Sequence, residues 1–135
     1  EIAAQQGARL ILQNVIRPQE RREVLAGRSI DQIEADLLAL IPEELQQRID
    51  LQAIVVPGDP TEQLLYQSRA QDADLVVLGA HGASAFAAIT RNGIVYKVLA
   101  QAHAPVMTLS PAVLIAAGVP ADQASSAESF LAGIV

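Results

Sequence analysis

The sequence has 135 residues, 51% of them apolar, with no cysteine and a formal net charge of −6, which suits one compact domain with a sizeable core. The acidic balance argues against nucleic acid or an anionic membrane surface as a partner, because both attract clustered Lys and Arg. The absence of Cys excludes a disulfide framework and thiolate metal sites.

The predicted strands are short aliphatic segments that end in turn residues, as strands of a buried sheet do. They cover residues 8–15, 51–56, 74–78 and 105–109. The longest apolar run, 112–119, is far shorter than the roughly 18 residues that a membrane span requires. With no signal peptide visible, we expect a soluble, cytoplasmic protein.

Helical patterns alternate with these strands. The segment 29–48 has apolar residues at helical spacing, and Pro42 is expected to end or kink that helix and start a second turn. Asp59 is a good N-cap for the next helix, with Pro60 at its first position and Glu62 at the capping-box position. A third helix is expected around Val95 and Val98. Alternating strands and helices predict right-handed βαβ units and a parallel sheet.

The loop after the strand 74–78 carries the clearest chemical signal. Gly79 and Gly82 follow a buried strand, and Asn92-Gly93 precedes a helix. Glycines let the backbone approach a ligand, and free N–H groups at a helix start favour phosphate. The loop has neither the Gly-Lys-Ser/Thr of a P-loop nor the dinucleotide fingerprint. Taken alone, the two glycines more often mark just a tight turn after a strand.

Three signatures in succession resemble the universal stress protein family: Gly58-Asp59-Pro60, the segment 73–82 and Ala104-Pro105-Val106. The resemblance implies an open, mostly parallel five-stranded sheet with helices on both faces. ATP-binding members carry Gly, two residues, Gly, nine residues, then Gly and Ser/Thr. Gly79 and Gly82 match, but Asn92-Gly93 stands in place of Gly-Ser/Thr, so the hydroxyl that meets a phosphate is missing.

The end of the sequence resembles the beginning of the family's fold. Val119-Pro120-Ala121-Asp122 looks like the family's first strand, and 124–135 looks like the start of its first helix, which 1–6 would continue. One domain spanning 1–135 in rotated order is our hypothesis, with 112–135 as a circular permutation, a swapped segment or a tandem fragment. An unrelated C-terminal extension stays open.

The resemblance also implies a site and a partner. Asp122, beside Pro120, would face the ribose, and Val15 would present backbone to the adenine. The phosphate side is expected to consist of Gly79, Gly82, Asn92 and Gly93. Structural roles for single residues remain open, such as Asp122 or Asn92 as helix N-caps and Val15 as core. A homodimer through the edge strand Val106 to Leu109 is implied as well.

Three functions follow, in order of preference. The first is a regulatory module that binds ATP or another adenine nucleotide, accompanied by Mg²⁺, and acts in stress response through dimerisation. The second is a ligand-free interaction domain of the same fold. The third is an enzyme that cleaves or transfers phosphate, which we rank last because no general base, P-loop Lys or acidic metal pair is evident. We expect no catalytic residue and no protein-held metal site.

Overall fold

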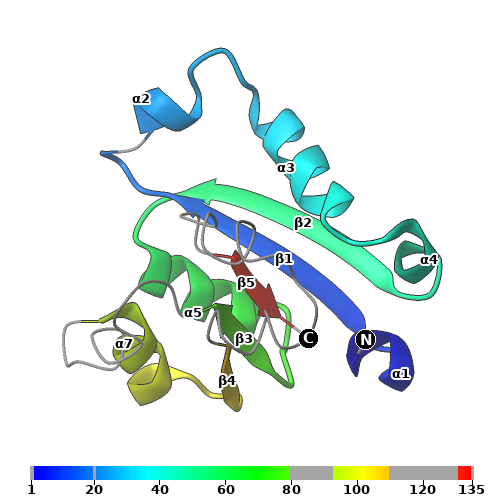
Figure 1. Ribbon diagram of the computed structural model, residues 1–135. Helices are drawn as coiled ribbons and strands as arrows, with labels where there is room; N and C mark the ends of the chain where they lie inside the picture. The colour runs from blue at the N-terminus through cyan, green and yellow to red at the C-terminus, as the bar shows by residue number, and fades with distance from the viewer. Residues whose placement is uncertain (1, 20, 80–92, 110–130, 135) are drawn as a thin grey trace.

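The computed structural model describes residues 2–19, 21–79, 93–109 and 131–134 (Figure 1). The site residues Gly82, Asn92, Pro120 and Asp122 lie outside these ranges. The described elements are α1 (Ile2–Gln6), β1 (Arg9–Ile16), α2 (Arg21–Val24), α3 (Ile30–Ala39), α4 (Glu43–Gln46), β2 (Asp50–Pro57), α5 (Pro60–Ala70), β3 (Val76–Gly79), α7 (Ile94–Gln101), β4 (Val106–Leu109) and β5 (Leu131–Ile134).

A five-stranded sheet in the order β2-β1-β5-β3-β4 forms the centre of the fold. The pairs β1–β2 and β3–β4 are parallel, whereas β5 runs antiparallel to both of its neighbours. Four strands therefore point the same way. This confirms the prediction of a mostly parallel α/β sheet, and the predicted strands agree with β1 to β4 within two residues at each end.

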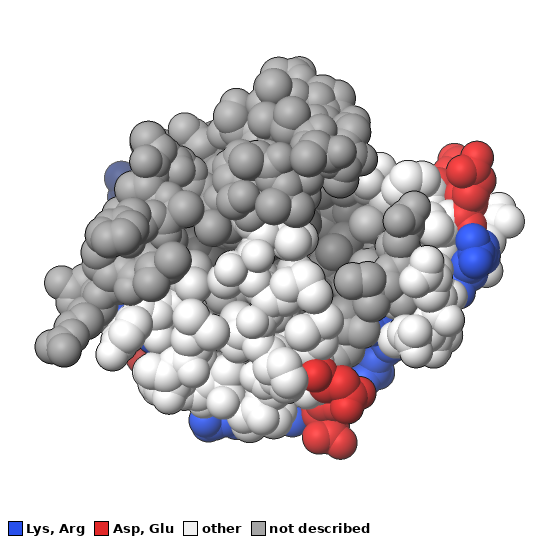
Figure 2. Space-filling model, turned by 60° about the horizontal axis from the view of Figure 1, so that its bottom comes forward, with Lys and Arg blue, Asp and Glu red and all other residues white. Residues whose placement is uncertain are grey.

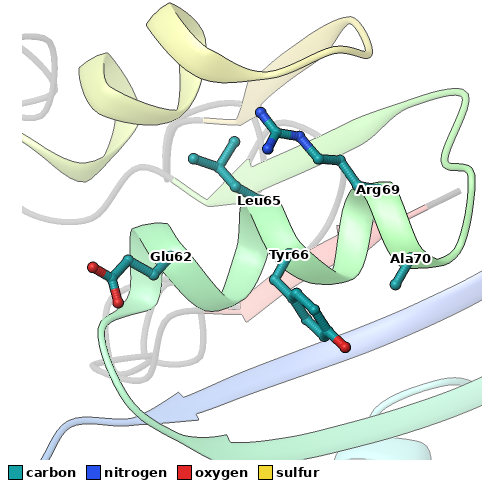
Figure 3. Close-up of a pocket in the computed structure, with 5 residues that line it drawn as sticks. All are labelled: Glu62, Leu65, Tyr66, Arg69 and Ala70. Atoms are coloured by element: carbon teal, nitrogen blue, oxygen red, sulfur yellow. The ribbon is translucent and has the colours of Figure 1, made fainter.

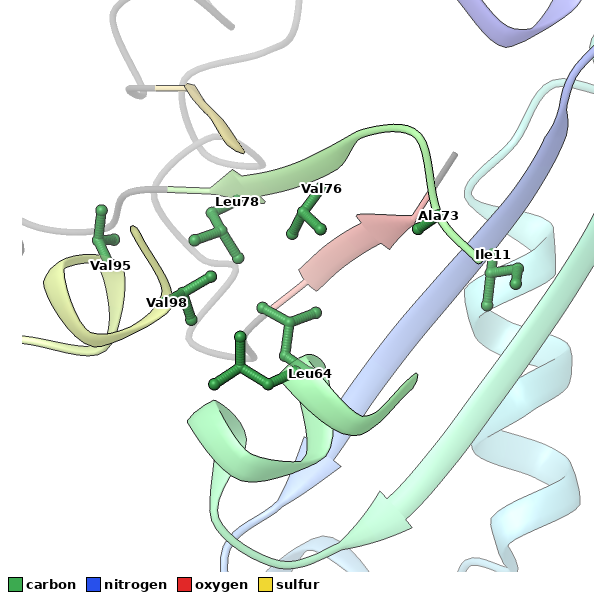
Figure 4. Close-up of a cluster of buried hydrophobic side chains, with 8 residues drawn as sticks. Ile11, Leu64, Ala73, Val76, Leu78, Val95 and Val98 are labelled. Atoms are coloured by element: carbon green, nitrogen blue, oxygen red, sulfur yellow. The ribbon is translucent and has the colours of Figure 1, made fainter. Parts of the chain in front are cut away.

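Helices cover both faces of the sheet because β1 is apolar on both sides. On one face, Leu12 and Ile16 pack with Val55 of β2 and with Ile33 and Leu37 of α3. On the other face, Ile11 belongs to a cluster with residues of α5, β3 and α7. In Figure 4, Val95 and Val98 of α7 and Leu64 of α5 point toward Val76 and Leu78 of β3.

The caps that delimit the helices follow from local sequence. Asp59 accepts a hydrogen bond from the Glu62 N–H at 3.1 Å, and Pro60 opens α5, as predicted. Pro42 separates α3 from α4, also as predicted. A full capping box starts α3. The Ser29 side chain accepts a hydrogen bond from the Gln32 N–H, and the Gln32 side chain accepts one from the Ser29 N–H. Sequence analysis missed it, although Ser-x-x-Gln before an apolar stripe is its signature.

One expected element is wrong. Residues 131–134, expected to be helical, form strand β5 between β1 and β3. A strand that lies between two others forms backbone hydrogen bonds with both neighbours. In addition, Gly133 and Ile134 have weak helix propensity. The expected strand 119–122 lies outside the described residues. The other half of the proposed joined helix, α1, is present and ends at Gln6, directly before Gly7, whose φ is 61°.

Among the described strands, the two outer ones, β2 and β4, differ at the edges that face away from the sheet. On β2, the outward N–H of Val55 donates to the Glu34 carboxylate of α3, 3.2 Å away, so a helix side chain occupies this edge. On β4, one hydrogen bond to β3 sets which backbone groups point outward. Val76 donates to the Pro105 carbonyl at 2.9 Å, so the N–H groups of Val106 and Thr108 point away from β3.

Candidate functional site at the carboxyl edge

The carboxyl ends of β1 to β4 lie at one edge of the sheet, because these four strands run in the same direction. The strands end there at Ile16, Pro57, Gly79 and Leu109. Antiparallel β5 begins at the same edge, where Leu131 is in register with Asn14. The strand order reverses between β1 and β3, the position at which open α/β sheets bind ligands.

A hollow of about 370 Å³ lies at this edge and is formed by three separate parts of the chain. The loop after β1, the loop after β2 and the first residue of α7 contribute to its wall. The lining residues are Arg17, Pro18, Gln19, Gly58, Asp59, Pro60 and Ile94. Its wall thus combines a guanidinium, a carboxylate, an amide and apolar surface.

Gly58 holds the loop after β2 against β1. Its N–H donates to the Ile16 carbonyl at 3.0 Å, and its φ is 147°, a conformation that L side chains rarely adopt. A Cβ at this position would lie 3.0 Å from Gln63 Cγ. Only glycine therefore allows this turn without strain. The neighbouring Asp59 caps α5, so the structural role predicted for its carboxylate is confirmed.

The start of α7 presents backbone donors at the same edge. Gly93 is the N-cap and provides no side-chain acceptor for the first N–H groups of the helix. Its φ of −75° and ψ of 149° are extended, so this position does not require glycine. Ile94, the next residue, lines the hollow. The N-terminus of a helix of this kind favours an anion.

Two further predicted site residues are described. Val15 is buried, with 9% of its surface exposed, and is in register with Val56. Because the Gly58 N–H bonds the Ile16 carbonyl, the peptide groups of Val15 point the other way, toward the β5 and β3 side. Gly79 ends β3, half-buried and in register with Leu109. Both residues thus belong to the edge that contains the hollow, although neither lines it.

Sequence analysis missed two buried polar side chains. Gln13 on β1 is fully buried and Thr61 on α5 is 5% exposed. Among the residues that the structure describes, the Gln13 amide oxygen and nitrogen and the Thr61 hydroxyl have no hydrogen-bond partner. Unpaired buried polar atoms each cost about 1–3 kcal/mol. A Gln inside the aliphatic stretch Leu10 to Ile16 was the available signal for the first of them.

The charged side chains of the described residues are of mixed sign. On the face shown in Figure 2, Lys and Arg stand singly and Asp and Glu lie among them. Within the described ranges, no group of three or more His, Asp and Glu could hold a metal ion. None of the described helices is long and apolar enough to cross a membrane.

The sequence match agrees with this architecture. Residues 1–110 match the universal stress protein family. The chain belongs to that family. Among curated proteins, none matches the sequence significantly.

Solved structures resemble this universal stress protein in fold. One is a universal stress protein crystallised in complex with cAMP, 23% identical, with a TM-score of 0.60 over 81% of this chain and 79% of that chain. Another is the hypothetical protein MJ0577, whose biochemical function was assigned from its structure. It is 19% identical, with a TM-score of 0.59 over 81% of this chain and 85% of that chain.

Proposed function

We propose that this universal stress protein is a non-catalytic regulatory module that binds ATP or another adenine nucleotide at the carboxyl edge of its sheet. The observation that carries the proposal is the convergence of the α7 N-terminus with the loops after β1 and β2 around one hollow. Helix N-H groups suit a phosphate, and the mixed polar and apolar wall suits a nucleoside.

The proposed contacts divide between two sides of the nucleotide. Gly79, Gly82, Asn92 and Gly93 hold the phosphates, as the family resemblance implies. Val15 offers backbone to the adenine, and its peptide groups point toward the reversal point of the sheet. Mg²⁺ would accompany a bound polyphosphate, held mainly by phosphate oxygens and water.

Pro120 and Asp122 complete the ribose side in this proposal. The segment that contains them leaves β4 at Leu109 and returns at Leu131, and both of these residues lie at the carboxyl edge. The rotated chain order remains our hypothesis for the origin of this segment, either within one chain or by exchange between copies.

The departure at Asn92-Gly93 bears on which nucleotide binds. Without the family's hydroxyl, the phosphate side has one hydrogen-bond donor fewer, so we expect only a small advantage of ATP over nucleotides with one phosphate. One structural neighbour was crystallised with cAMP, and cAMP is therefore a ligand to test on this protein. The second candidate function, a ligand-free interaction domain, is favoured by the same departure.

We further propose that the protein works in the cytoplasm as a homodimer joined through β4. The outward N–H groups of Val106 and Thr108 are those a second strand would pair with. The opposite edge is less suited to pairing, because Glu34 occupies the Val55 N–H and Pro57 has no N–H.

Calorimetric titration with Mg-ATP, AMP and cAMP tests the nucleotide proposal. We expect saturable binding by the native protein and loss of at least tenfold in affinity for Asp122→Ala. Asp50→Ala is the matched control, because Asp50 is exposed at the opposite end of β2. Absence of heat with all three nucleotides, in a folded protein, would favour the ligand-free domain. Turnover of the bound nucleotide would instead support an enzyme.

A further inference from the structure

The outer side of α5 carries a shallow hollow of about 490 Å³ on the surface of the helix layer. The described residues that line it come from this one helix: Glu62, Leu65, Tyr66, Arg69 and Ala70 (Figure 3). Its middle is apolar, and the two charged residues stand at its ends. Glu62 lies near the start of α5, and Arg69 lies near its end.

Apolar exposure gathers on this helix layer. Tyr66 is 65% exposed, and α7, which packs beside α5, exposes Tyr96 and Leu99. These are three of the five large apolar side chains that are exposed in the described part of the chain. Grouped apolar exposure rimmed by charges is typical of a protein–protein contact.

The spacing of Glu62 and Arg69 along α5 is compatible with a two-fold symmetric contact. Glu62 and Arg69 are separated by two helical turns, or about 10 Å along the axis, and therefore lie on the same side of α5. The midpoint between them falls between Leu65 and Tyr66. A two-fold axis through that midpoint exchanges the acidic end with the basic end, which is the self-complementarity that a symmetric dimer contact requires.

We propose that a second copy of this chain docks on α5, with the two α5 helices antiparallel. Glu62 of each copy then faces Arg69 of the other, and the two Tyr66 rings cover the apolar middle. Arg69 already donates one hydrogen bond to the Gln101 carbonyl at 3.3 Å, but a guanidinium has five N–H donors and keeps others for a carboxylate. The occupant is a copy of this chain because its two charged ends complement its own surface.

This contact is separate from the proposed pairing of β4, because α5 covers a face of the sheet whereas β4 is its edge. The two contacts use different residues and do not exclude each other. A protein that uses both contacts forms assemblies larger than a dimer. The α5 contact also does not depend on whether a nucleotide binds.

Sedimentation equilibrium on charge-reversed variants tests the proposal. Glu62→Arg and Arg69→Glu each bring like charges together across the two-fold axis, and each should weaken the association step at least tenfold. An equimolar mixture of the two variants restores both ion pairs and should recover the native association constant. Glu44→Arg and Arg48→Glu are matched controls, because both residues are exposed near α4.

The native chain has no cysteine, so a single introduced thiol provides a second readout that does not require reversed charges. Tyr66→Cys places a thiol next to the two-fold axis, and oxidation should cross-link two copies. Glu44→Cys should not cross-link. Association constants unchanged by both reversals, or a mixture that fails to recover association, would overturn the proposal. A Tyr66→Cys protein that forms no disulfide-linked dimer under oxidation would do so as well.

Discussion

The backbone N–H of Gly58 donates a hydrogen bond to the carbonyl of Ile16, 3.0 Å away. This bond joins the loops that follow two neighbouring strands, and both loops line the hollow at the carboxyl edge. It also sets the direction of the peptide groups along β1. The Gly-x-Pro signature is therefore a structural device that positions the site, with Asp59 and Pro60 starting α5 next to it.

Gly58→Ala should lower the free energy of unfolding by about 1–3 kcal/mol, because alanine resists the φ of 147° and its Cβ would meet Gln63. Urea denaturation measures the effect. Gly27→Ala is the matched control: its φ is 77°, but a Cβ there has nothing within 4 Å. Equal losses for the two variants would show that contact with Gln63 contributes nothing.

Gln13→Leu should raise the free energy of unfolding by about 1–3 kcal/mol. Leucine has a similar volume and removes two buried polar atoms that have no partner. Thermal and urea denaturation measure the change. Ser68→Ala is the contrasting variant, because the buried Ser68 hydroxyl donates to the Leu65 carbonyl at 3.0 Å and its loss should destabilise. A less stable Gln13→Leu protein would mean that the amide is hydrogen-bonded in solution.

Glu34→Ala should destabilise the protein by about 1 kcal/mol and promote aggregation, because it uncovers the Val55 N–H on the outer edge of β2. Light scattering during unfolding and refolding reports the second effect. Glu34→Gln keeps a side-chain oxygen that can accept the Val55 N–H. The stability and aggregation of this variant should therefore be close to those of the native protein. If the glutamine variant aggregates like the alanine variant, the carboxylate charge protects the edge and the hydrogen bond does not.

Ser29→Ala should cost about 1 kcal/mol of stability, because it removes the side-chain acceptor of the Gln32 N–H, 3.2 Å away. Ser29→Asp retains an acceptor and adds a charge that the helix start favours. Equilibrium unfolding of the two variants side by side distinguishes capping from any other role of Ser29. The prediction is wrong if the aspartate variant is as destabilised as the alanine variant.

Sequence analysis predicted the elements that depend on neighbouring residues. Asp59 caps α5 through a residue three positions later, and Pro42 divides two helices by its own geometry. The helix expected at residues 131–134 was wrong, because it was expected from the family resemblance, whereas this segment pairs with two distant strands. Of the predicted site, Val15, Gly79 and Gly93 belong to the carboxyl edge, while Gly82, Asn92, Pro120 and Asp122 lie outside the described residues.

By itself, the sequence determined the fold class, the family signatures, the Asp59 cap of α5 and the division of two helices at Pro42. Each of these depends on side chains within a few residues of one another or on a repeated apolar pattern. Only the tertiary structure decided that β5 separates β1 from β3, that Gln13 is buried without a partner in the described part of the chain, and that Glu34 occupies the Val55 N–H. These features depend on strand register and on helix placement, which join residues far apart in the chain and have no local signature.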